Sequence, residues 1–393
     1  MITTRIIDDL PSAEKLSPEW DALASANKLP MASPAWMLAW WRHQAPDGAR
    51  LRIVAVHDGD HLIGIAPLYC ETPLRCRPTT YRLLAANFST SVAPLAVRNR
   101  AWEIAEAIGS ALLDADPRPD LIALEPTPLD SPWLPALRDR WPGPVRPLAL
   151  QYDLQPMPVV SLQEDSFDTW LAGRSAKFRS SMRRLERLFD GEGGTMRLST
   201  ADTLQADVES FARLHAMRWE RRGDSRLTVL GDRLQETLLD VGHALLSDEP
   251  QHVPHPGKRM RLRIIEVAHV AICADISIAA GGQSVGFNMG WDERFKRLSP
   301  PLLAFLDEIR HCFAYGDRCF ELGWGGNAYK LRFANGDTPV TWNLLLPSGP
   351  RLPLALAQTA PLATSAWARE KGKRLLTTEQ IDRLRPLARL MAR

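Results

Sequence analysis

The segment from Ser284 to Trp324 constrains the fold more than any other part of the chain. It consists of an apolar strand, a short charged loop, a helix and a second strand. The helix, over 300–315, has an apolar stripe at spacings of three and four, begins after Ser299 with Pro300, and ends at a glycine. A strand–helix–strand crossover is normally right-handed and makes its strands parallel neighbours. The segment therefore predicts an α/β fold in which helices cover a sheet.

The same order of elements occurs twice along the 393 residues. Helices come first, then a β-meander, and then strand–helix–strand. We expect a mixed α+β architecture of tandem domains, each a mixed twisted sheet flanked by helices, because both halves show this order. The expected domains are 1–160 and 161–349, followed by a helical tail over 350–393 that packs as an appendage.

Local patterns place individual elements. In the second half we expect helices at about 175–189, 203–221 and 232–247. In the first half, the run over 82–97 is interpreted as a strand. In the tail, Thr377 or Thr378 is the expected helix cap.

Composition excludes several classes of protein. The formal net charge of +2 indicates no DNA partner. No apolar run reaches the roughly 18 residues of a membrane span, and the N-terminus lacks a secretory signal, so we expect a cytoplasmic protein. The five cysteines form no CxxC pair, which fits reduced thiols. His252 and His255 lie between prolines with no nearby Cys or carboxylate ligand set, so no metal is expected.

The helix over 174–187 is unusually basic, with six basic residues and one acidic residue, a local charge of +5. Arg179, Arg183 and Arg187 are four residues apart and therefore share one face. Like charges at this spacing repel, so the stripe does not stabilise the helix. It is either a solvated face or a surface for an anionic partner, such as a phosphorylated sugar, a lipid-linked precursor or an anionic glycan.

Two other segments have both a structural and a functional interpretation. His215 and Trp219 continue an apolar helical stripe, which favours plain packing, but an imidazole there can also act as a general base. In GWGGNAYKLRF, glycines that permit a close backbone approach precede Tyr329 and Lys330. The simpler interpretation is a turn with a surface lysine. Trp36, Trp40 and Trp41 are expected in the core rather than as a sugar platform.

Several motifs, taken in order, resemble a known family. SPEWDALASANKLPMASPAWMLAWWRH and HLIGIAPLY occur in the first half, and FRSSMRRLERL, LHAMRWERRG, GWDERFKRLSPPLL and GNAYKLRF in the second. Together they resemble GNAT acyltransferases of the CelD/BcsL type, which are associated with cellulose and other exopolysaccharide synthesis. The chain is similar also to the Fem-type peptidoglycan aminoacyltransferases. Both resemblances imply tandem GNAT-like domains.

The resemblance implies where the chemistry takes place. In a GNAT fold, two parallel strands splay apart, the acyl thioester lies in the gap, and the acceptor arrives from the other side. The splay would lie between 284–291 and 319–324. The implied catalytic residues are Lys330, Tyr329 and His215, the last as general base. Acetyl-CoA or another acyl-CoA would be the co-substrate, with no metal.

The resemblance also implies binding residues. Those expected to bind coenzyme A are Asn288, Gly290, Arg297, Ser299, Leu302 and Leu303. Those expected to bind the acceptor are Arg179, Arg183, Arg218, Trp219, Trp291, Asp292 and Trp324. Asp292 would either pair with Arg294 or orient the acceptor. The first half lacks a Gly-rich loop at the equivalent place, 89–97, and is expected to be a degenerate copy.

One departure from the family pattern leaves three hypotheses open. Coenzyme A-binding GNAT enzymes carry Q/R-x-x-G-x-G/A, whereas this chain has prolines at 300 and 301, which lack an N–H. The first hypothesis is an acyl-CoA-dependent N-acyltransferase acting on an amino sugar or glycan precursor, free or lipid-linked. The second is a Fem-like transferase that uses aminoacyl-tRNA. The third is a catalytically silent accessory protein, associated peripherally with a membrane polysaccharide synthase.

Overall fold

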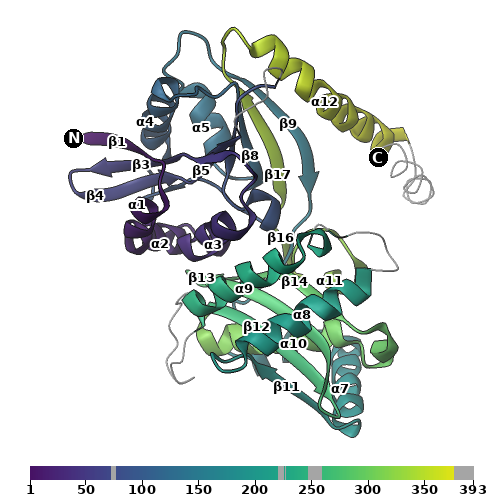
Figure 1. Ribbon diagram of the computed structural model, residues 1–393. Coiled ribbons are helices and arrows are strands. Elements are labelled where there is room, and N and C mark those ends of the chain that lie inside the picture. Colours follow the sequence, from purple (N-terminus) through teal and green to yellow (C-terminus); the bar gives the residue numbers. More distant parts are fainter. Residues whose placement is uncertain (72–76, 220–224, 226, 247–258, 376–393) are drawn as a thin grey trace.

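The structure is a computed structural model, and it describes residues 1–71, 77–219, 225, 227–246 and 259–375. Two α/β halves pack against each other, and the long helix α12 extends from the first half (Figure 1). The mixed α/β fold predicted from the sequence is confirmed. No helix in these ranges is long and apolar enough to cross a membrane.

The elements of the first half follow the predicted order of helices, meander and crossover. They are β1 (Ile2–Ile7), α1 (Leu10–Lys15), α2 (Ser17–Ala26), η1 (Pro30–Ala32), α3 (Pro34–Gln44), β2 (Ala49–Leu51), β3 (Ile53–Asp58), β4 (His61–Ala66), β5 (Leu68–Glu71), β6 (Thr80–Leu83), η2 (Ala86–Phe88), β7 (Leu95–Ala96), α4 (Ala101–Asp114), β8 (Leu121–Pro128), α5 (Trp133–Asp139) and β9 (Leu148–Gln155).

The second half repeats this order. Its elements are β10 (Pro158–Ser161), α6 (Phe167–Gly173), α7 (Ala176–Gly191), β11 (Gly194–Leu198), α8 (Leu204–Trp219), η3 (Thr228–Leu230), α9 (Asp232–Leu245), β12 (Arg259–Val267), β13 (Val270–Ala280), β14 (Gln283–Trp291), η4 (Glu293–Leu298), α10 (Pro300–Tyr315), β15 (Cys319–Glu321), α11 (Ala328–Leu331), β16 (Gly336–Asp337) and β17 (Val340–Leu346), followed by α12 (Leu352–Leu375).

One strand of the second half belongs to the sheet of the first half. The sheet of the second half has the order β11-β12-β13-β14-β15-β10-β16, and that of the first half β2-β5-β6-β8-β17-β9. Thus β17 pairs with β8 and β9 of the first half, although it follows the whole second half in sequence. This differs from the expected 161–349 domain, because a strand's place in a sheet is set by long-range pairing that no local pattern encodes.

Helices cover both faces of the second sheet. On one face, α10 and α7 pack through an apolar cluster that includes Leu303, Ile309, Met182 and Leu185. On the other face, α8 and α9 contribute to a cluster that continues into the first half, where α3 packs against α9. Because the halves share this core, they form one packed body.

Trp36 belongs to the core between the halves. Its ring lies 5.0 Å from the ring of Phe88 and 4.9 Å from that of Phe287. Trp36 and Trp40 are fully buried, so they are core residues, as expected, and no sugar platform. The partly buried Trp41 packs against the same core.

The interpretation of 82–97 as a strand is wrong. β6 ends at Leu83, Ala85 adopts a left-handed φ of 54°, and a 3-10 turn, η2, follows. The tail helix packs through Leu352 and Ala355 onto β17. The expected cap at Thr377 or Thr378 lies outside the described residues.

Candidate active site

A fork between β14 and β15 opens the second sheet. The two strands pair in parallel only where Gln283–Val285 face Cys319–Glu321. Beyond Glu321 the chain follows β10, because the N–H groups of Leu322 and Gly325 donate to the carbonyls of Pro158 and Pro156, both at 2.9 Å. β14 meanwhile stays paired with β13. The gap lies where the sequence resemblance predicts it.

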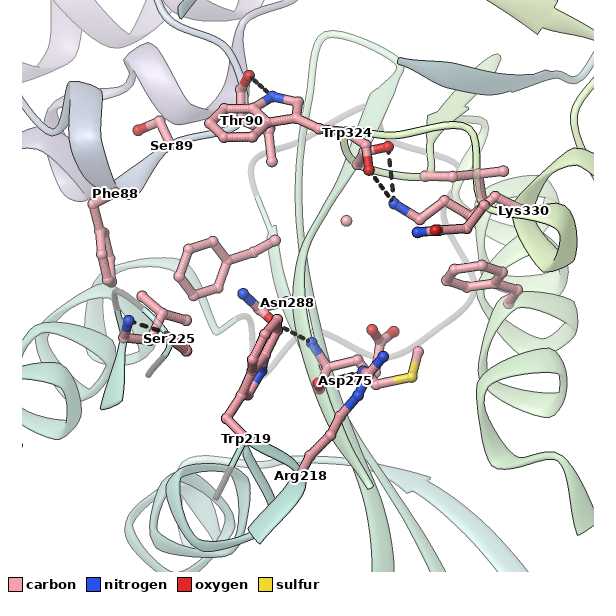
Figure 2. A pocket seen from close by; sticks show the side chains of 18 of the residues that line it. Phe88, Ser89, Thr90, Arg218, Trp219, Ser225, Asp275, Asn288, Trp324 and Lys330 are labelled. Carbon is pink, nitrogen blue, oxygen red and sulfur yellow. Dashed lines mark hydrogen bonds between the residues drawn. The ribbon is translucent and has the colours of Figure 1, made fainter. Parts of the chain in front are cut away.

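A cavity of about 590 Å³ occupies this fork. Its walls come from β13, β14, α8, α10, α11, the loop after β15, and the η2 region of the first half (Figure 2). The lining residues are Asn87, Phe88, Ser89, Thr90, Arg218, Trp219, Ser225, Leu227, Asp275, Gly286, Phe287, Asn288, Met289, Phe305, Leu322, Gly323, Trp324, Asn327, Tyr329 and Lys330. Both halves therefore contribute to the site.

A β-bulge shapes β14 at the cavity. Ile276 of β13 faces Asn288 and Ser277 faces Gly286, so Phe287 is an extra residue. The bulge interrupts the alternation of side chains at this point. Phe287 packs on the core shared with the first half, and Asn288 points toward Trp219 (Figure 2). The Asn288 side chain accepts the N–H of Met289 at 2.9 Å.

Lys330 is held inside the cavity wall rather than on the surface. It is 8% exposed, and its Nζ donates to the carbonyls of Gly323 at 3.0 Å and Trp324 at 2.7 Å. Burial, and next the charge of Arg218, lowers the pKa of Lys330 to about 8. The side chain is therefore an ammonium at pH 7 but loses its proton in a mildly alkaline range. Tyr329, its neighbour, stacks on Phe305 with ring centroids 5.9 Å apart.

Trp324 links the lysine to the first half. Its Nε1 donates to the carbonyl of Thr90 at 2.5 Å, and its ring packs edge-on against Trp342 at 4.9 Å (Figure 2). The same residue's carbonyl accepts from Lys330. The loop that positions Lys330 is thus anchored across the interface between the halves.

Donors from α8 face the cavity on its other side. Arg218 Nη1 donates to the carbonyl of Met289 at 3.2 Å, and the guanidinium lies 5.9 Å from the Trp291 ring. Within the described residues, the buried Nε of Arg218 and Nε1 of Trp219 have no hydrogen-bond partner. With Lys330, these groups make the cavity rich in donors, which suits an oxygen-rich or anionic ligand.

His215 does not line the cavity. It is 1% exposed, lies between the rings of Phe211 and Trp219, and shares a hydrogen bond of 2.9 Å between its Nε2 and Ser225 Oγ. Burial, followed by the nearby charge of Arg218, lowers its pKa to about 4. The imidazole is therefore neutral at pH 7, and its neighbours Ser225 and Trp219 line the cavity.

The N-terminus of α10 does not present free amides. Pro300 and Pro301 have no N–H, and the N–H groups of Leu302 and Leu303 point to the carbonyl of Ser299, at 2.9 and 3.4 Å. Both leucines are buried in the core. Main-chain recognition of a pyrophosphate, as expected for coenzyme A, therefore does not fit this helix end.

Several other predicted binding residues also lie outside the cavity lining. Arg297 pairs with Glu192 at 2.7 Å. Gly290 serves packing, since a side chain there would lie 2.4 Å from the backbone nitrogen of His215. Asp292 caps η4 and pairs with Arg294 at 2.6 Å, which lowers the pKa of its carboxyl. Trp291 lies beneath Arg218. These positions depend on tertiary partners that motif spacing does not reveal.

Arg179 and Arg183 also lie apart from the cavity. With Ala176, Ser180 and Arg187 they line a separate hollow of about 280 Å³ on α7, which we call the arginine hollow. Arg179 is held there because its Nη1 donates to the carbonyls of Ala172 and Arg174. The other two guanidinium groups are exposed.

The equivalent fork of the first half is filled by side chains. There β6 and β8 are parallel over Thr80–Arg82 and Leu121–Ala123. Directly beyond, Arg82 pairs with Glu125, which also accepts from the hydroxyl of Tyr152. An ion pair thus lies where the pairing of β6 and β8 ends, whereas the second half has a cavity beyond its parallel pair.

Sequence reasoning missed part of the site. Asn87, Ser89 and Thr90 belong to the run interpreted as a strand, and the alanine in a left-handed conformation gave no signal. Asp275 lies inside an apolar strand and was not singled out. In the described ranges no cluster of His, Cys, Asp and Glu could hold a metal, and His252 and His255 lie outside those ranges.

Comparisons with known proteins agree with this geometry. Residues 176–331 match the family model described as an acetyltransferase (GNAT) domain. The crystal structure of FemX is similar, with a TM-score of 0.57 at 12% identity, covering 87% of this chain and 96% of that chain. No curated protein matches in sequence.

Two further solved structures share the fold. One is the C-terminal domain of a protein named as a lysylphosphatidylglycerol synthetase from Agrobacterium fabrum, with a TM-score of 0.53 at 10% identity, covering 89% of this chain and 97% of that one. The other is a protein of unknown function from Bacteroides thetaiotaomicron, with a TM-score of 0.52 at 10% identity, covering 88% and 100%. Residues 176–331 thus match an acetyltransferase (GNAT) domain, which supports an acyltransferase.

Proposed function

We propose that the protein transfers an acyl group to an amine or hydroxyl of an amino sugar or glycan precursor, in exopolysaccharide or cell-envelope biosynthesis. The observation that carries this proposal is the cavity in the β14–β15 fork, with the Lys330 ammonium in its wall. The fork brings donor and acceptor together from its two sides, so that catalysis rests on proximity and on stabilisation of charge.

Each side chain has a defined part in this reaction. The acceptor lies against Trp219, Arg218 and the η2 region, and the unpaired Nε of Arg218 and Nε1 of Trp219 bind its oxygen atoms. The Lys330 ammonium stabilises the negative charge that develops on the carbonyl oxygen when the acceptor attacks. Tyr329, on the same helix, also lines the cavity and orients the substrate.

Coenzyme A is the first candidate for the acyl carrier, because the matching family model is that of an acetyltransferase. An aminoacyl ester, as on tRNA, is the second. It is favoured by one observation: the first turn of α10 offers no free amides to a pyrophosphate. In both cases the reacting group is an activated carbonyl in the fork.

The arginine hollow supports an anionic partner outside the cavity. Glu186, the acidic residue within the basic stretch, is paired with Arg310 and does not neutralise the stripe. Arg183 and Arg187 remain exposed beside the held Arg179. We infer that this face contacts phosphodiester groups at a membrane, which suits a lipid-linked glycan acceptor and peripheral association.

The donor is identified by binding and turnover. Titration calorimetry with acetyl-CoA, and transfer assays with acetyl-CoA and with aminoacyl-tRNA, use glucosamine as the probe acceptor. Transfer from acetyl-CoA supports the first candidate, and transfer from aminoacyl-tRNA alone supports the second. If the protein binds neither donor at millimolar acetyl-CoA or micromolar aminoacyl-tRNA, it is no transferase of this kind, and the accessory role replaces the proposal.

A further inference from the structure

Asp275 is a buried carboxylate that reaches the cavity. It lies on β13, faces Arg263 of β12 and Met289 of β14 in register, and is 4% exposed. Figure 2 shows its carboxylate and the Lys330 amine pointing into the cavity from opposite sides. Any acyl acceptor in the fork would therefore lie between a carboxylate and an ammonium.

One oxygen of Asp275 is held while the other is available. Arg263 Nη1 donates to Oδ2 at 3.1 Å, and among the described residues no hydrogen bond reaches Oδ1. The carboxylate is thus fixed from behind by a buried guanidinium. This geometry leaves a free acceptor oxygen on the cavity side.

Arg263 is shared with other carboxylates, so it does not fully neutralise Asp275. Its Nε donates to Asp307 at 2.6 Å and its Nη2 to Glu308 at 2.9 Å, both on α10. Glu308 also accepts from Arg261 and from the hydroxyl of Ser284. Asp275 therefore belongs to a largely buried network in which each cation serves more than one anion.

This environment sets the protonation of Asp275. Burial raises its pKa to about 7, the Arg263 guanidinium opposes that shift, and the charges of Glu308 and Asp307 add to it. Cys273, on the same strand, stays a thiol because burial and Asp275 raise its pKa. The remaining charged groups that line the cavity are the basic side chains Arg218 of α8 and Lys330 of α11. Asp275 thus exchanges its proton near neutral pH.

The other titratable groups nearby are poor proton acceptors. Lys330 already carries its proton at pH 7. His215 does not line the cavity, and its low pKa means that it binds a proton weakly. A general base works best when its pKa lies near the working pH. Asp275 lines the cavity and has a pKa of about 7, so it meets both the geometric and the chemical requirement for a general base.

We propose that Asp275 is the general base that takes the proton from the attacking amine or hydroxyl. The role rests on the proposed acyl transfer. The nucleophile bonds to the carbonyl carbon and its proton moves to Oδ1. The bond from that carbon to the leaving sulfur or oxygen then breaks, and the leaving group departs with the proton, which returns Asp275 to the carboxylate.

The test compares full-length wild type with Asp275→Asn and Asp275→Glu. The matched control is Asp207→Asn, because Asp207 is also a buried carboxylate held by an arginine, Arg197, but lies outside the cavity lining. With glucosamine as acceptor, and with kcat/KM calculated for its unprotonated amine, the value for wild type should fall as pH drops through about 7. Asp275→Asn should lose about 10²–10⁴-fold and show no such limb, whereas Asp275→Glu should recover part of the rate. Asp207→Asn should keep the limb.

Failure of this inference and of the proposed function are distinguishable. If Asp275→Asn keeps the wild-type profile, the base assignment falls while acyl transfer stands. If wild type transfers no acyl group, the proposed function falls. In that case a carbon-13 NMR titration of the protein with labelled aspartate tests the base assignment without turnover, and the signal missing from Asp275→Asn identifies the Asp275 carboxyl. A carboxyl that titrates near pH 7 supports the assignment. A carboxyl that stays ionised throughout pH 5–8 overturns it.

Discussion

Replacing Lys330 by methionine should abolish most activity while leaving the fold intact. The ammonium is the cation that Figure 2 shows pointing into the cavity from α11. Removing one preorganised donor to a developing oxyanion typically costs about 10²–10³-fold in kcat. Methionine keeps a similar length and removes only the charge and the donors. We therefore expect a loss of this size with the donor that supports turnover.

The effect on stability should be small, because two terms oppose each other. The pKa of Lys330 falls from 10.5 to about 8, which corresponds to a cost of about 3 kcal/mol for holding the charge in this site. Methionine removes that cost but leaves the carbonyls of Gly323 and Trp324 without this donor, at roughly 1–3 kcal/mol each. The free energy of unfolding should change by no more than about 3 kcal/mol.

The dependence on pH gives a second readout. The unfolded chain holds the lysine proton up to about pH 10.5, whereas the folded protein releases it near pH 8. Wild type should therefore gain stability relative to Lys330→Met as pH rises between these values, because the unfolded state binds more protons there. Activity should fall in the same range, as the ammonium is lost.

Thermal denaturation and steady-state kinetics together test whether Lys330 acts in catalysis rather than in stability. Lys330→Arg keeps the charge at all pH values tested, so the activity of this variant should no longer fall on the alkaline side of its pH profile. Lys15→Met replaces an exposed lysine of α1 and should change neither quantity. The reasoning is refuted if Lys330→Met retains more than a tenth of wild-type kcat, or if it melts more than about 5 °C lower with a matching loss of activity.

Three other predictions follow from contacts outside the reacting atoms. Trp324→Phe removes the hydrogen bond to Thr90 but keeps an aromatic ring. The kcat should therefore fall about tenfold, and the alkaline limb of the pH–activity profile should move to higher pH. An unchanged profile contradicts this expectation. Arg183→Glu should weaken binding to phosphatidylglycerol vesicles by about 2 kcal/mol, with a clearly smaller effect from Arg184→Glu, on another face of α7; equal effects in a sedimentation assay argue against a specific surface. Glu308→Ala strands two buried arginines and should cost about 3–5 kcal/mol in denaturant unfolding, whereas a loss below 1 kcal/mol would show that Asp307 and Asp317 suffice.

Sequence patterns locate elements where the signals are local. The helix expected over 300–315 is found as Pro300–Tyr315, because its start and its terminal glycine are marked by neighbouring residues. The fork lies where the resemblance places it. Lys330 and Trp324 line the cavity, and the glycine-rich approach to them is visible in the sequence.

Features that depend on distant partners could not be predicted. Arg297 matches a motif position, yet it pairs with Glu192, which lies more than a hundred residues earlier. Asp275 and Thr90 reach the cavity only because β13, η2 and the loop after β15 meet in space. Burial decides the protonation of His215, and a helical stripe does not show how completely an imidazole is enclosed.

The place of β17 in the first sheet bears on how the chain folds during synthesis. β9 is complete at residue 155, but its partner β17 begins at residue 340. At roughly 5–20 residues per second, a ribosome needs about 10–40 s to make the intervening segment. Until then the β8 and β9 edges of the first half remain unpaired, a state in which edges attract other strands. The nascent first half therefore depends on shielding, by a chaperone or by its own helices, until the last strand arrives.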